Sequence, residues 1–67
     1  MTIIKGDLVR THNGVVGIVE VVYGAAADPE LRQMDIELDL VGKVLVGVGS
    51  ELNFVISTSG LEKVTRQ

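Results

Sequence analysis

Acidic side chains alternate with apolar ones along residues 34–41, which read Met-Asp-Ile-Glu-Leu-Asp-Leu-Val. If this segment is an extended strand, Asp35, Glu37 and Asp39 project from one face at intervals of about 7 Å, from a rise of about 3.3 Å per residue. That spacing is too wide for a calcium site, which gathers six or more oxygen ligands around one ion, usually from a loop. We therefore predict no metal site, and interpret the three carboxylates as a solvent-exposed row or as a face that docks to a basic partner.

The single histidine, His12, lies beside Asn13 in a stretch typical of a turn. A histidine acts as a general base only with a nucleophile and an orienting group beside it, and no serine or threonine motif accompanies this one. The segment Gly42-Lys43-Val44 also lacks the Ser or Thr that completes a phosphate-binding loop. We therefore predict no catalytic residue and no cofactor, and expect a non-enzymatic protein.

Composition narrows the classes of partner. The chain has 67 residues, which is one domain, and a domain of this size buries only about 60% of the surface that its unfolded chain exposes. It contains no cysteine, so disulfides cannot stabilise it. A net charge of −3 and a pI near 4.8 oppose nucleic-acid binding, which needs clustered Lys and Arg. No apolar run approaches the roughly 18 residues of a membrane span, and the N-terminus lacks a signal-peptide pattern, so we expect a cytoplasmic protein that does not contact a membrane.

The first third of the chain reads as a β-hairpin. Residues 7–11 are rich in strand-forming side chains, and Asn13-Gly14 follows, the dipeptide that favours the positive φ angles of a two-residue hairpin turn. Residues 15–23 are dominated by valines, which suit a pleated strand better than a helix. Gly17 inside this strand is typical of a bulge that lets a small sheet curl.

The remainder predicts further strands joined by turns. Residues 24–33 read as a loop in which Asp28 could cap one helical turn over residues 29–32. The strict alternation of residues 34–41 predicts a half-buried antiparallel strand. The last three segments are residues 42–51 as a strand or a projecting arm, 52–58 as a strand, and 61–65 as a short helical turn or a last brief strand. We therefore predict a single all-β domain over residues 1–67, a small barrel or roll of five to six short antiparallel strands with one short helical turn at most.

Two segments resemble SH3-like barrels. The opening Gly-Asp-x-Val-Arg at residues 6–10 and the closing Ser-Gly-Leu-Glu-Lys-Val at residues 59–64 are similar to the layout of KOW-type modules and of type II dihydrofolate reductase. The KOW resemblance implies binding to RNA or to the transcription and translation machinery. The reductase resemblance implies an enzyme whose site lies in the central pore of a tetramer. Its signature Val-Gln-Ile-Tyr is missing, because residues 53–56 read Asn-Phe-Val-Ile, so no catalytic residue carries over.

Apolar side chains occur on both faces of the strand at residues 15–23, which is more than one face of a miniature barrel can bury. The excess surface comprises Val16, Ile18, Val22, Leu45 and Val46. Left in water it would be an aggregation hazard, so we predict that a second copy or a protein partner covers it. The alternative is a bent strand whose ends enter the core from opposite faces.

The expected function is therefore a protein-interaction or assembly module. It would act as a homo-oligomer, or as a small subunit or regulator of a larger complex. KOW-like nucleic-acid binding and an oligomeric pore enzyme are the alternatives.

Overall fold

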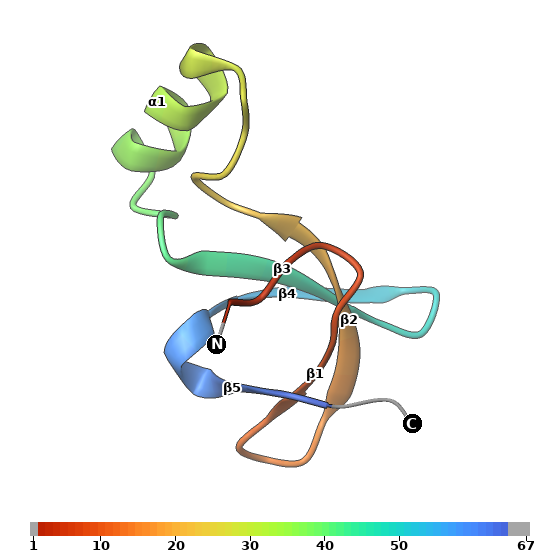
Figure 1. Ribbon diagram of the computed structural model, residues 1–67. Coiled ribbons are helices and arrows are strands. Elements are labelled where there is room, and N and C mark those ends of the chain that lie inside the picture. Colours follow the sequence, from red (N-terminus) through yellow and green to blue (C-terminus); the bar gives the residue numbers. More distant parts are fainter. Residues whose placement is uncertain (1, 65–67) are drawn as a thin grey trace.

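The computed structural model describes residues 2–64, which form one antiparallel sheet and a helix that projects from it (Figure 1). The elements in chain order are β1 (Leu8–Thr11), β2 (Val16–Val22), α1 (Pro29–Glu37), β3 (Lys43–Val48), β4 (Leu52–Ser57), a 3-10 turn (Thr58–Gly60) and β5 (Leu61–Lys63). The strand order is β4-β3-β2-β1-β5. The predicted small domain of five short antiparallel strands is confirmed. A closed barrel is not found, because β4 and β5 remain the two edges of the sheet formed by residues 2–64.

A small valine cluster on one side of the sheet forms the core. Val9, Val19, Val44 and Val46 are each at most 1% exposed, and we call the face that carries them the inner face. They come from the three central strands β1, β2 and β3, so the core lies where the sheet curls on itself. The opposite side is the outer face.

A bulge in β2 changes which side chains reach the core. The register between β2 and β3 shifts between Val19, which pairs with Val46, and Val21, which pairs with Leu45. The shift reverses the alternation along the strand, so Val22 packs against the core while Val21 is exposed. The predicted bulge at Gly17 is therefore wrong in position.

Gly17 has a different role, which is to let two strands approach closely. A Cβ atom at this position would lie 2.6 Å from Val46 Cγ1 and 2.7 Å from the Gly47 carbonyl oxygen. Such distances are far below van der Waals contact, so only glycine fits at this point of β2 beside β3.

The hairpin between β1 and β2 turns through three residues rather than two. The Gly14 N–H donates to the Thr11 carbonyl at 3.0 Å, and the Thr11 N–H donates to the Val15 carbonyl at 2.9 Å. Only Gly14, at φ 86°, has a positive φ angle in this turn. The predicted turn is confirmed, and its geometry is that of a type I turn followed by a left-handed glycine.

Residues 34–41 do not form the predicted strand. They contain the end of α1 and the turn that follows it, and the single helical turn expected over 29–32 is the start of this longer helix. Asp28 caps the helix as expected, since its Oδ1 accepts from the Glu30 N–H at 2.9 Å, and Pro29 occupies the first helical position.

The end of α1 is closed by backbone hydrogen bonds. The Asp39 N–H donates to the Ile36 carbonyl at 3.1 Å, and the Leu40 N–H donates to the Asp35 carbonyl at 2.8 Å. Asp39 adopts φ 57°, the left-handed conformation that this motif requires.

The open alternatives for the later segments are now settled. Residues 43–48 are a strand, and the part of the chain that projects is α1. Residues 61–63 are a strand that returns to pair with β1, while Thr65, the last residue of that predicted segment, lies outside the described residues. Within residues 2–64 no helix has the length and apolar character that crossing a membrane requires.

Candidate interaction surface

The side chains that could bind a metal or take part in catalysis do not gather into one site. Asp35 accepts a hydrogen bond from the Gly24 N–H at 2.6 Å, and Asp39 lies 3.9 Å from the Lys43 ammonium, so neither belongs to a free carboxylate row with Glu37. The predicted row is wrong because these residues belong to a helix and its C-terminal turn. No group of three or more His, Cys, Asp or Glu side chains within residues 2–64 is arranged to hold a metal ion.

The opening and closing segments that resemble SH3-like barrels pair with each other. Arg10 on β1 forms an ion pair of 3.0 Å with Glu62 on β5, and the two are register partners. Asp7 accepts from the Ile4 N–H at 2.9 Å and lies 3.3 Å from the Lys63 ammonium. The two segments therefore hold the fold together at its β1–β5 edge.

These contacts set the ionisation of Asp7. The hydrogen bond from the Ile4 N–H lowers the pKa of the Asp7 carboxyl below its ordinary value. The Lys63 ammonium, through its hydrogen bond and its charge, lowers that pKa further.

The outer face of the sheet carries an uncovered apolar patch across β2, β3 and β4. We call it the outer patch, and it consists of Val16, Ile18, Val21, Leu45 and Val55. The four residues other than Leu45 are 40–46% exposed, and Leu45 is half-buried between its register partners Val21 and Val55. An apolar surface that spans three adjacent strands is larger than the scattered single side chains usual on a monomer.

One polar pair interrupts the outer patch. With its amide turned so that nitrogen faces the carboxylate, Asn53 donates to Glu20 Oε2 at 2.8 Å. The Glu20 carboxylate lies directly over Gly47, where an added Cβ would come within 2.9 Å of it. This pair supplies the one charge near the centre of an otherwise aliphatic surface, and it would give a contact there a preferred register.

The outer patch contains part of the surface predicted from the sequence. Val16, Ile18 and Leu45 lie together on it. Val22 and Val46 do not, because Val22 faces inward after the β2 bulge and Val46 is 1% exposed in the core. This placement corrects the predicted surface for those two residues.

Sequence reasoning missed Val21 and Val55 as members of the outer patch. The alternation in residues 52–57 places Val55 opposite Phe54 and Ile56, which is a signal that could have identified Val55. Val21 reaches the outer face only because of the bulge, and no sequence pattern marks the bulge at that position.

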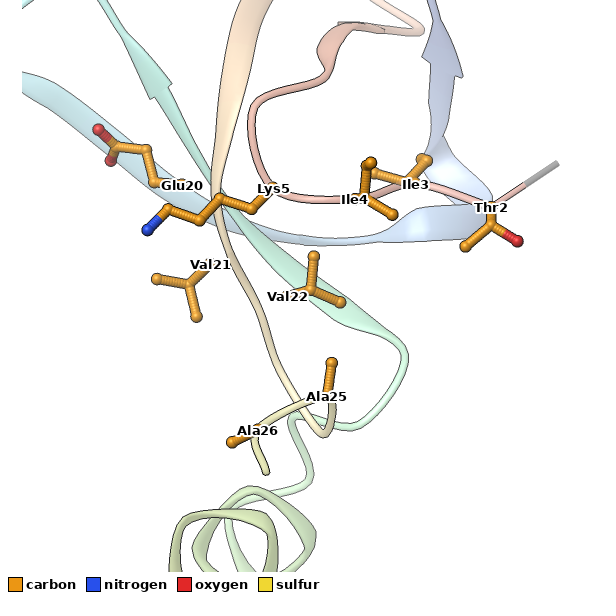
Figure 2. Close-up of a pocket in the computed structure, with 9 residues that line it drawn as sticks. All are labelled: Thr2, Ile3, Ile4, Lys5, Glu20, Val21, Val22, Ala25 and Ala26. Atoms are coloured by element: carbon orange, nitrogen blue, oxygen red, sulfur yellow. The ribbon is translucent and has the colours of Figure 1, made fainter. Parts of the chain in front are cut away.

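An apolar groove adjoins the outer patch at Val21 (Figure 2). It has a volume of about 450 Å³ and lies between the N-terminal segment and the end of β2. Its lining comprises Thr2, Ile3, Ile4, Lys5, Glu20, Val21, Val22, Ala25 and Ala26. The side chains of Lys5 and Glu20 extend to the same end of the groove, while the rest of the lining is almost entirely aliphatic.

A second apolar groove lies where the sheet fails to close. It has a volume of about 520 Å³ and is lined by Phe54 and Ile56 of β4 and by the hairpin residues His12 and Val15. His12 is exposed beside this groove, and no nucleophile or carboxylate of residues 2–64 hydrogen-bonds to it. His12 lies in the turn between β1 and β2.

Comparison of the chain with protein-family models, with curated proteins and with solved structures found no match.

Proposed function

We propose that this chain is a non-enzymatic SH3-like interaction module of the cytoplasm that associates with a second copy of itself through the outer patch. The observation that carries the proposal is the set of five aliphatic side chains on the outer face of β2, β3 and β4, four of which are 40–46% exposed. Apolar side chains gathered on one face of a sheet are one mark of a protein-protein contact, and Val21, Leu45 and Val55 form a row across three strands.

The size of the outer patch makes its burial energetically significant. Four side chains at 40–46% exposure and the half-buried Leu45 leave about 200 Å² of apolar surface, if fully burying one aliphatic side chain removes about 100 Å². At about 25 cal/mol per Å², covering that area contributes about 5 kcal/mol for each copy. This contribution is comparable with the whole folding stability of roughly 3–10 kcal/mol expected for 67 residues.

The topology supports the SH3-like assignment within this proposal. Four strands follow one another as an antiparallel meander, and after a 3-10 turn the fifth strand returns to pair with the first. The ion pairs Arg10–Glu62 and Asp7–Lys63 join the two segments that resemble SH3-like barrels.

The cations of the chain give little support to nucleic-acid binding. Within residues 2–64, Arg10, Lys43 and Lys63 are already within 4.0 Å of a carboxylate of the same chain. Phosphate contacts require clustered and available Lys or Arg side chains, so we favour a protein partner.

The experiment compares the masses of two aspartate variants. Ile18→Asp places a carboxylate on the outer patch, and Leu52→Asp makes the same kind of change at a side chain that is 57% exposed and points to the inner side of the sheet. By light scattering near 10 µM we expect wild type and Leu52→Asp to be at least dimeric and Ile18→Asp to be monomeric, since an unpaired buried carboxylate strongly opposes association. If Ile18→Asp keeps the wild-type mass and its fold, the outer patch is not the contact.

A further inference from the structure

Helix α1 is a second uncovered apolar element. It has nine residues, and none of them is buried. Leu31, Met34 and Leu38 follow the spacing of one helical face, and they are 50–63% exposed. Helices shorter than about 12 residues are marginal in water without packing, so α1 requires a surface to cover this stripe.

The chain holds α1 away from its own sheet (Figure 1). The Asp35 carboxylate on α1 accepts from the Gly24 N–H at 2.6 Å, which ties the helix to the segment that leaves β2. We call residues 28–39 the α1 protrusion. The protrusion projects from the sheet, and its apolar stripe is exposed.

The stripe on α1 and the outer patch have matching dimensions. From Leu31 to Leu38 the stripe is about 10 Å long, at about 1.5 Å per residue. The outer patch crosses β2, β3 and β4, which at about 4.8 Å between strands is also about 10 Å wide. A helix laid on a sheet face is a standard way for both elements to bury their apolar sides.

The charges of the chain favour contact between the α1 protrusion and a sheet over contact between two protrusions. The protrusion carries five carboxylates and one guanidinium, whereas residues 2–27 and 40–64 together carry four basic and four acidic side chains. Two protrusions packed on each other would bring ten carboxylates together. A protrusion packed on the sheet, whose basic and acidic side chains balance, meets fewer carboxylates, chiefly Glu20 at the centre of the outer patch.

The buried area distinguishes this arrangement from two outer patches packed face to face. Interfaces are about 60% apolar, so two patches alone would bury about 700 Å² in total, below the roughly 1,200 Å² of stable complexes. If each copy also contributes the stripe of α1, the total rises to about 1,200 Å², which reaches the lower end of the range for stable complexes.

We infer that the α1 protrusion of each copy packs on the outer patch of the other, in a two-fold dimer with two equivalent helix-on-sheet contacts. This inference rests on the proposed self-association and specifies which surfaces meet. Leu31, Met34 and Leu38 of one copy lie over Ile18, Val21 and Val55 of its partner. In this dimer the stripe of α1 and the outer patch of each copy are both covered, through one kind of contact that occurs twice.

Disulfide trapping tests the contact directly, because the chain contains no cysteine of its own. Met34→Cys and Ile18→Cys are purified separately, mixed in equal amounts under reducing conditions and then oxidised. Intact-mass spectrometry separates the mixed disulfide from the two products that link identical variants. We expect the mixed product to exceed the sum of the other two at least fivefold, whereas Met34→Cys mixed with Leu52→Cys should give no such excess.

Each outcome separates this inference from the proposed function. Dominance of the Ile18–Ile18 product would show self-association through two facing outer patches. It would overturn the role of α1 and leave the proposed function standing. Dominance of the Met34–Met34 product would overturn the helix-on-sheet contact and the role of the outer patch. If no product forms and the wild-type chain is monomeric, the proposed self-association fails as well.

A complementation experiment provides a second test that uses no cross-link. Met34→Asp and Ile18→Asp should each weaken the dimer at least tenfold, because each variant loses both equivalent contacts in its homodimer. In a mixture, the intact helix of Ile18→Asp can still pack on the intact patch of Met34→Asp, so the mixed dimer should form more strongly than either homodimer. A mixture that associates no better than its two components overturns the inference.

Discussion

Replacing Gly17 by alanine tests the packing between β2 and β3 on which both faces of the sheet depend. The new methyl group would lie 2.6 Å from Val46 Cγ1 and 2.7 Å from the Gly47 carbonyl oxygen. The second atom is backbone, so relief requires β3 to move by close to 1 Å, judged against ordinary carbon contacts of about 3.5–4.0 Å. Val46 is in the core, and the movement would disturb the valine cluster directly.

The expected cost of Gly17→Ala is about 2–3 kcal/mol, the upper part of the range for overpacked sites. In a domain of this size that corresponds to a fall in Tm of about 10–20 °C. Gly47→Ala is the matched control, because its methyl group would meet only the Glu20 carboxylate at 2.8–2.9 Å, the far end of a flexible side chain. We expect Gly47→Ala to change stability by less than about 1 kcal/mol.

Urea denaturation followed by far-ultraviolet circular dichroism measures both variants. Because association raises apparent stability, the variants and the wild type are compared at one protein concentration. Equal losses in Gly17→Ala and Gly47→Ala, or no loss in Gly17→Ala, would refute the close approach of β2 and β3 described above.

Three further changes test local features of the fold. Asp7→Asn removes the carboxyl whose pKa is lowered in the fold, and that carboxyl stabilises the fold at pH values above its unfolded pKa. The stability advantage of wild type over Asp7→Asn should therefore shrink between about pH 5 and pH 3. Denaturation at each pH measures this advantage, and a constant difference would contradict the lowered pKa. Asp28→Ala removes the cap of α1 and should destabilise the helix by about 1 kcal/mol. Amide hydrogen exchange should become faster in α1 and stay unchanged in β3, whereas faster exchange throughout the sheet would be inconsistent with an unburied helix. Asp39→Gly relieves a left-handed residue and should slow exchange in α1 by an amount corresponding to about 0.5–1 kcal/mol, while faster exchange would show that φ 57° carries no strain.

Much of the sheet could be predicted from the sequence because its strands carry strong local signals. The valine-rich residues 15–23 and the Asn13-Gly14 turn specify a hairpin with little competition from other conformations. The bulge after Val19 could not be predicted, because it depends on how β2 pairs with β3. That one shift moves Val22 to the core and Val21 to the surface.

The sequence predicts only the first turn of α1, because two periodicities overlap in the residues that follow. Met34, Ile36 and Leu38 alternate as in a strand, yet Leu31, Met34 and Leu38 also match one face of a helix. The helical signals were the Asp28 cap, the following proline and a run with only one β-branched side chain. No burial separates the two readings, since every residue of α1 lies outside the core.

The outer patch could be predicted in part from the sequence. A strand that is apolar on both sides indicates an uncovered face, and Ile18 lies on that face. The pattern of residues 34–41 predicts a strand, so the exposed apolar stripe that these residues form with Leu31 could not be recognised.

Sedimentation equilibrium of the wild-type chain between about 1 µM and 1 mM tests the central claim most directly, because dissociation constants of stable small interfaces fall in or below this range. Association through the outer patch predicts a mass of at least two subunits of 7.2 kDa each at the upper concentrations, with dissociation on dilution. A folded chain that stays at 7.2 kDa throughout that range, with the outer patch in water, would contradict the account.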